Sequence, residues 1–121
     1  MRTFVGMGLA FVVSVLAGCG GAAALPPVST AAQAVRIGKA DPSPGMKEVG
    51  PIEAIHGEGC GAMGNKGSYE GALAVLKNKA ASDGADYVQI FTMTEPHSES
   101  GCFDQTFKIR GMAFKGGTAP P

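Results

Sequence analysis

The chain of 121 residues contains no tryptophan, and only 7% of its residues are aromatic. Its ten basic residues are balanced by ten acidic residues, so its formal net charge is zero. Proteins that bind nucleic acid usually carry a clear excess of positive charge, so we expect no nucleic-acid partner. Histidine occurs only twice, which leaves few ways to build a histidine-based catalytic or metal site.

The N-terminal hydrophobic run is shorter than the roughly 20 apolar residues that a transmembrane helix needs. It covers residues 4–15, follows a positive charge at Arg2 and gives way to a glycine-rich stretch. A short apolar run behind a positive charge is typical of a secretory signal peptide, which we predict over residues 1–18. We expect the remaining chain, about 100 residues, to be exported and to form one domain.

The predicted cleavage site is formed by Leu16, Ala17, Gly18 and Cys19. These residues resemble the lipobox of bacterial lipoproteins, in which the preceding peptide is removed and both the Cys thiol and the new amino terminus are acylated. Several acyl chains hold a protein on a membrane far more firmly than one. The resemblance implies lipidation of Cys19 and a membrane anchor at the N-terminus. The alternative is ordinary signal cleavage near residues 22–24, with Cys19 removed.

The residue after Cys19 bears on which membrane holds the lipid. Enterobacterial lipoproteins that stay at the inner membrane carry Asp at this position, where this chain has Gly20. By that rule we expect a cell-envelope protein that is lipid-anchored at the outer membrane and faces the periplasm.

Composition divides the exported chain into three parts. Residues 19–33 begin with the lipidated Cys and continue as an uncharged stretch rich in Gly, Ala and Pro, which is typical of a flexible tether. Residues 34–115 carry regular hydrophobic patterns, so we predict a single domain there. Residues 116–121 are predicted to form a disordered tail.

Within the domain the sequence predicts four strands and one helix. Alternating or β-branched segments at residues 34–38, 49–57, 87–94 and 105–115 are the predicted strands. The expected fold is of the α+β class, an α/β sandwich. It has one small sheet of about four strands with one helix packed on it, in the order β-β-α-β-β.

The helix is predicted over residues 69–82, with Ser68 as its N-cap and Gly84 as its C-terminal stop. Its large apolar side chains recur at helical spacing, and we interpret this stripe as core packing rather than as a binding site. The residues of the stripe are Tyr69, Leu73, Leu76 and Ala80.

Lipidation of Cys19 leaves an even pair of cysteines, Cys60 and Cys102. Exported thiols are usually oxidised, so we predict a disulfide between them, either structural or redox-active. A helix that joins two strands of one sheet usually makes a crossover between parallel neighbours. If residues 49–57 and 87–94 run parallel, their C-terminal ends lead into the two loops that carry these cysteines, and a bridge between the loops becomes geometrically natural.

The same reasoning brings two histidines toward the two cysteines. The set of His56, Cys60, His97 and Cys102 could hold zinc, so a metal-binding periplasmic domain is the alternative function. The spacings match no standard zinc finger, and a disulfide would use both thiols. Beyond this alternative we expect no metal site, no cofactor and no catalytic residues.

The whole chain resembles a family of small bacterial lipoproteins of unknown function, typified by the enterobacterial YjeI proteins. The segments that carry the resemblance are Ala34-Val35-Arg36-Ile37, Val49-Gly50-Pro51-Ile52, Leu76-Lys77-Asn78-Lys79-Ala80-Ala81, Gly84-Ala85-Asp86-Tyr87-Val88 and Ile109-Arg110-Gly111-Met112-Ala113-Phe114. The envelope-stress sensor RcsF is similar in its overall plan of lipid, linker and small disulfide-containing α/β domain. The chain departs from the first family at two positions where members commonly carry Cys, since it has Met46 or Lys47 after the first turn and Lys115-Gly116 at the end of the last strand, so their bridge is not carried over.

These resemblances imply a membrane-anchored envelope lipoprotein and transfer no catalytic residue. We expect a non-enzymatic interaction or envelope-sensing module. Its expected partners are the membrane, contacted through the N-terminal lipid, and an envelope protein whose identity the sequence does not give.

Overall fold

The computed structural model describes residues 21–121, so the predicted signal peptide over residues 1–18 and the predicted lipidation at Cys19 lie outside the described residues. In chain order the elements are α1 (Thr30–Gln33), β1 (Arg36–Gly38), β2 (Lys47–His56), the 3-10 helix η1 (Gly61–Met63), α2 (Tyr69–Ser82), β3 (Tyr87–Thr94), β4 (His97–Glu99), β5 (Cys102–Asp104) and β6 (Phe107–Lys115). None of the described helices is long and apolar enough to cross a bilayer.

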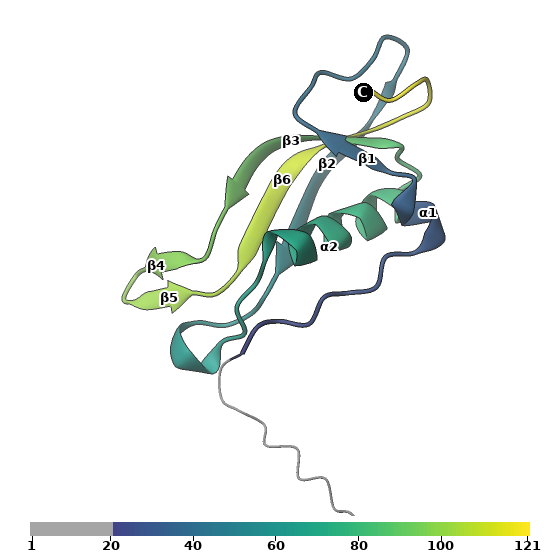
Figure 1. The fold of residues 1–121 in the computed structure, drawn as a ribbon. Helices are drawn as coiled ribbons and strands as arrows, with labels where there is room; N and C mark the ends of the chain where they lie inside the picture. Colours follow the sequence, from purple (N-terminus) through teal and green to yellow (C-terminus); the bar gives the residue numbers. More distant parts are fainter. Residues whose placement is uncertain (1–20) are drawn as a thin grey trace, which may run out of the picture.

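The main sheet has four strands in the order β1-β3-β6-β2, and α2 lies across one of its faces (Figure 1). β1 pairs parallel with β3, whereas β6 pairs antiparallel with both β3 and β2. The expected mixed α/β class with a four-stranded sheet and one long helix is therefore confirmed. β2 and β3 run in the same direction as expected, but they are not neighbours, because β6 lies between them.

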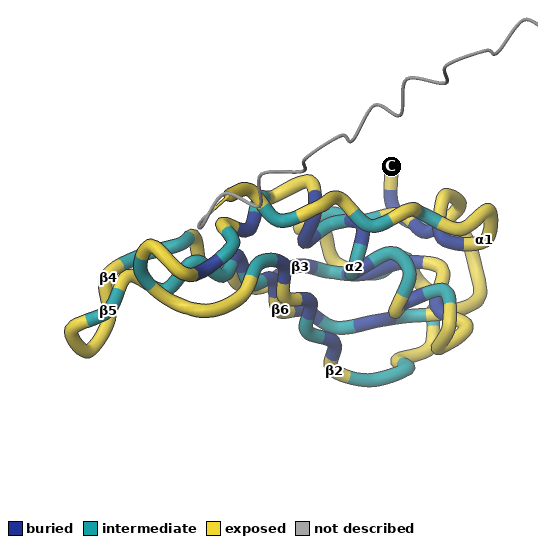
Figure 2. The backbone as a smooth tube through the Cα atoms, turned by 90° about the horizontal axis from the view of Figure 1, so that it is seen from below, coloured by how far each residue is buried: buried dark blue, intermediate teal, exposed yellow. Residues whose placement is uncertain are grey.

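The expected order of elements is incomplete, because the chain adds α1, η1 and a small hairpin. The hairpin consists of β4 and β5 and separates β3 from β6. Its two-residue turn is formed by Ser100 and Gly101, with φ angles of 49° and 81°. Two successive positive φ angles are typical of the hairpin turns that match strand twist. The residues between β3 and β6, for which the sequence predicted no strand, thus form a hairpin that lies away from the buried core (Figure 2).

Helix α2 follows the sequence pattern closely. The Ser68 hydroxyl accepts a hydrogen bond from the Gly71 amide at 3.1 Å, which caps the first turn. Gly84 adopts a φ of +74° just after the helix, a left-handed conformation that glycine adopts without a steric penalty. The helix packs on β2 and β6, and the core between these layers is completely apolar at its centre. Its least exposed large side chains include Leu76, Val88 and Ile109.

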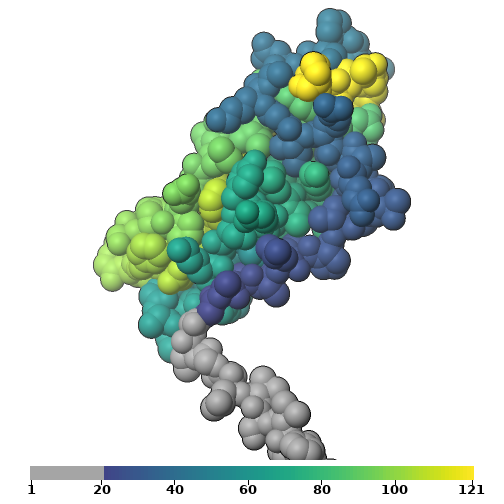
Figure 3. All heavy atoms as spheres, viewed as in Figure 1, coloured from purple at the N-terminus to yellow at the C-terminus, as the bar shows by residue number. Residues whose placement is uncertain are grey.

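The segment predicted to be a flexible tether, residues 19–33, differs from that prediction over its described part. From Gly21 onward it runs along the domain surface beside α2 (Figure 3). The Ala23 amide donates to the Lys66 carbonyl at 2.8 Å, and the Lys66 amide donates to the Gly21 carbonyl at 2.9 Å. Further along, Asn78 of α2 donates to the Pro27 carbonyl at 2.8 Å. We call residues 21–29 the leader segment; it extends the folded domain well before residue 34.

The C-terminal tail, residues 116–121, also departs from the predicted disorder. The Gly116 amide donates to Asp86 Oδ2 at 2.8 Å, and Pro120 is buried. In Figure 1 the tail lies beside the loop that joins β1 to β2, at the end of the molecule opposite η1. Local hydrogen bonding and apolar contact therefore order a segment whose composition alone suggested fraying.

Candidate functional site

The two cysteines that the sequence pairs lie close together at one end of the domain. Cys60 immediately precedes η1 and Cys102 begins β5; their Cα atoms are 5.7 Å apart and their sulfurs are at disulfide-bonding distance. Cys60 also forms an isolated antiparallel bridge with Asp104. The pair therefore joins the loop after β2 to the β4–β5 hairpin, which otherwise contacts little of the core.

The four residues of the zinc alternative are not assembled into a metal site. Within residues 21–121 no group of three or more His, Cys, Asp or Glu side chains is arranged to hold a metal ion. The two cysteines pair with each other, and His97 is on the exposed hairpin, where its Nδ1 lies 2.9 Å from the Glu95 carbonyl. Both ring nitrogens of His56 already have hydrogen-bond partners. Because β2 and β3 run in the same direction, these residues lie toward the same end of the fold, but they are not arranged as ligands of one ion.

His56 instead joins three parts of the fold. Its side chain is 6% exposed, at the end of β2. Nδ1 accepts a hydrogen bond from the Ser68 amide at 2.9 Å, so the neutral ring must carry its proton on Nε2. Nε2 lies 2.8 Å from the Ala24 carbonyl and donates to it. His56 therefore connects the leader segment to the start of α2.

The ring of His56 lies over Gly71, where α2 has no side chain. A Cβ atom at position 71 would lie 2.1 Å from His56 Cε1 and Nδ1, far inside normal contact distance. Glycine is unfavourable in a helix by roughly 1 kcal/mol relative to alanine. Its presence in α2 is explained by the space that the His56 ring occupies.

Asp104 lies opposite Cys60 of the disulfide, and the pKa of its carboxyl departs from the ordinary value. Its pKa is lowered, first because the Thr106 hydroxyl donates to its carboxylate at 2.7 Å and then because the Thr106 amide donates to the same oxygen at 2.9 Å. Lys108 adds a further attractive charge. These interactions fix the turn between β5 and β6 when the carboxylate is ionised.

The lowered pKa of Asp104 predicts a loss of stability in acid. An acidic group whose pKa is lowered by folding stabilises the native state above the pKa of the unfolded chain, and this contribution is lost as the pH falls through the folded-state pKa. We expect Asp104→Asn to reduce the difference in unfolding free energy between about pH 6 and about pH 2, measured by urea denaturation. An unchanged pH dependence in this variant would contradict the assignment.

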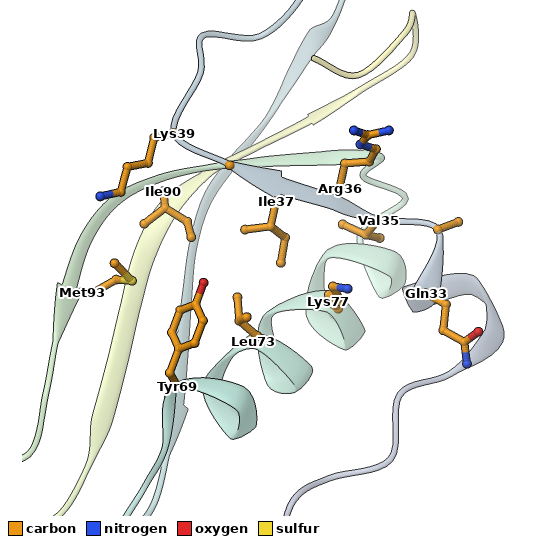
Figure 4. A pocket seen from close by; sticks show the side chains of 12 residues that line it. Gln33, Val35, Arg36, Ile37, Lys39, Tyr69, Leu73, Lys77, Ile90 and Met93 are labelled. Atoms are coloured by element: carbon orange, nitrogen blue, oxygen red, sulfur yellow. The ribbon is translucent and has the colours of Figure 1, made fainter. Parts of the chain in front are cut away.

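A second candidate site is an open cleft of about 460 Å³ between α2, β1 and β3 (Figure 4). It exists because α2 packs over β2 and β6 and leaves the β1 side of the sheet less covered. Its lining is about equally polar and apolar, and its large apolar side chains come from three elements: Ile37 of β1, Leu73 and Tyr69 of α2, and Ile90 and Met93 of β3. In Figure 4 the side chains of Ile37 and Leu73 point toward each other across the cleft.

The interpretation of the apolar stripe of α2 as core packing holds for only part of the stripe, as the exposed fractions of its residues show. Leu76 and Ala80 are fully buried, as core packing requires. Tyr69, one end of the stripe, is 44% exposed, and Leu73 is only partly buried. Half of the predicted core stripe therefore forms the wall of a cleft. Hydrophobic spacing identifies the apolar face of a helix but does not tell how much of that face a short edge strand covers.

Comparison with known proteins adds one relationship. No curated protein and no solved structure shows significant similarity to the chain. A family model described as "Domain of unknown function (DUF4156)" matches residues 26–115, about three quarters of the chain. The match begins inside the leader segment and ends at the last residue of β6. The chain therefore belongs to this DUF4156 family.

Proposed function

We propose that the protein is a membrane-anchored envelope lipoprotein whose domain acts as a non-enzymatic interaction or envelope-sensing module. The observation that carries this proposal is the lipobox-like Leu16-Ala17-Gly18-Cys19 at the end of a short apolar run. The overall resemblance to the YjeI type of small lipoprotein, and more distantly to RcsF, supports the same role. The placement at the outer membrane, facing the periplasm, is part of the proposal and rests on Gly20.

The leader segment supports a close anchor rather than a long tether. Its first described residue, Gly21, already accepts a hydrogen bond from Lys66, and only Gly20 separates it from Cys19. Two extended residues span at most about 7 Å. A lipid on Cys19 would therefore hold the end of the domain that carries the disulfide and η1 near the headgroups. The loop between β1 and β2 would then be the end that extends away from the membrane.

The proposed anchor is tested by labelling cells that produce the protein with a palmitate analogue. We expect the wild-type protein to incorporate the label and to sediment with membranes, and Cys19→Ala to lose both properties, because the acyl chains are attached at that residue. The matched control is the double variant Cys60→Ala with Cys102→Ala, which should keep the label. Label retained by Cys19→Ala, or a mature protein that lacks Cys19, would contradict the proposal.

A further inference from the structure

The edge of the main sheet is only partly covered. β1 pairs with β3 over three residues and ends at Gly38, opposite Gln89, whereas β3 continues to Thr94. Within residues 21–121 no other strand pairs with that side of β3. A register shift between Ile90 and Thr92 leaves Phe91 outside the regular pairing with β6. An extra residue of this kind bends a strand. The open edge of β3 is therefore short, only a few residues long. Such an edge presents backbone groups that can pair with an added strand.

The cleft described above lies directly beside this open edge. Met93, from the uncovered part of β3, lines the cleft and is 42% exposed, and Tyr69 from α2 is exposed to a similar extent. Figure 4 shows the side chains of Met93, Tyr69 and Leu73 around one part of the cleft, with the Tyr69 hydroxyl pointing into it. An acyl chain could fill that space but could not pair with the backbone of β3. An extended peptide can do both, since alternate side chains of an added strand point to the same face.

The charged residues that line the cleft are all basic. The charged residues that line it are Arg36, Lys39 and Lys77, and none of its described lining residues is acidic. In Figure 4 the Arg36 side chain points away from Leu73 and Met93, which leaves Lys39 and Lys77 on either side of these apolar side chains. The chain as a whole has equal numbers of acidic and basic residues, so this rim is a local feature. It is complementary to a ligand that carries carboxylates.

From the open edge, the apolar side chains on one part of the cleft and the cationic residues that line the rest, we infer that the cleft binds an extended acidic peptide segment. The segment adds to β3 beyond Gly38, places alternate apolar side chains between Leu73 and Met93, and directs carboxylates toward Lys39 and Lys77. This inference rests on the proposed role as an interaction module and names the chemistry of its partner. It does not depend on the lipid anchor.

The test uses the mature lipidated protein in nanodiscs and a fluorescein-labelled heptapeptide in which valine alternates with Asp and Glu. We expect the peptide to bind, as measured by fluorescence anisotropy, and to slow hydrogen exchange of the β3 amides near Met93. The double variant Lys39→Glu with Lys77→Glu should weaken binding by about tenfold, because two attractive contacts become repulsive. Lys47→Glu, at the far edge of the sheet, should leave binding unchanged.

Three results would overturn the inference. The first is absence of peptide binding. The second is binding of an otherwise identical peptide with Lys in place of Asp and Glu just as tightly. The third is that palmitate binds and the acidic peptide does not, and that palmitate binding depends on Lys39 and Lys77. That result would assign the cleft to an acyl chain. Binding by the Cys19→Ala protein is measured in parallel, so that failure of the lipid anchor and failure of the peptide site are separate outcomes.

Discussion

Replacement of both Cys60 and Cys102 by alanine should lower the free energy of unfolding by about 4 kcal/mol. The two residues are 42 positions apart, so the bond closes a long loop and removes many conformations from the unfolded chain. For a domain of this size that is a large share of a total stability of about 5–15 kcal/mol. The measurement is urea denaturation of the wild-type and double-variant proteins under the same conditions.

Reduction of the wild-type protein provides the matched control for this prediction. Reduced wild type should unfold at nearly the same urea concentration as the double variant, because both lack only the cross-link. Freshly isolated wild-type protein should contain no titratable thiol at Cys60 or Cys102. Two free thiols, or a stability difference below about 1 kcal/mol, would show that the pair is not an oxidised structural bond.

The substitution Gly71→Ala should destabilise the protein by about 2 kcal/mol, although alanine is the better helix former. Intrinsic propensity favours the substitution by roughly 1 kcal/mol, whereas forcing a methyl group into an occupied space costs about 1–3 kcal/mol or more. The new Cβ would lie 2.1 Å from the His56 ring, so that ring must move and its bonds to Ser68 and Ala24 are strained. Thermal or urea denaturation shows directly whether Gly71→Ala lowers or raises the stability of the protein.

Two further variants isolate the cause. Gly21→Ala adds the same methyl group where no heavy atom lies within 4 Å, so its stability should remain near that of wild type. In a His56→Ala background the ring is gone, and Gly71→Ala should then cost much less or become stabilising. If Gly71→Ala has the same effect with and without His56, contact with the ring is not the reason for the glycine.

The parts of the fold that could be predicted are those whose cause is local in the chain. The Ser68 cap, the Gly84 stop and the apolar spacing between them fix α2 within its own segment, and the β-branched and aromatic residues of β3 do the same for that strand. The approach of Cys60 to Cys102 was also predictable, because the helix between β2 and β3 orients both strands alike. No local sequence pattern indicates that β6 pairs between these two strands.

The parts that could not be predicted depend on residues far away in the sequence. The leader segment has no hydrophobic period, and it is held by His56, Lys66 and Asn78, which follow it by dozens of residues. The β4–β5 hairpin has strands of three polar or mixed residues, too short to show alternation. The cleft depends on how far β1 extends along β3, and hydrophobic patterns do not fix the length of an edge strand.

We propose that a lipid on Cys19 holds the disulfide end of the domain against the membrane. The most direct measurement is relaxation enhancement of backbone amides in the lipidated protein, embedded in bicelles that contain a headgroup-spin-labelled lipid. A two-residue connection predicts strong enhancement in residues 21–24 and in Gly61–Met63, and none in the loop between β1 and β2, at the opposite end. Weak and uniform enhancement over all these residues would contradict the claim, since it would mean that the domain moves freely on a long tether.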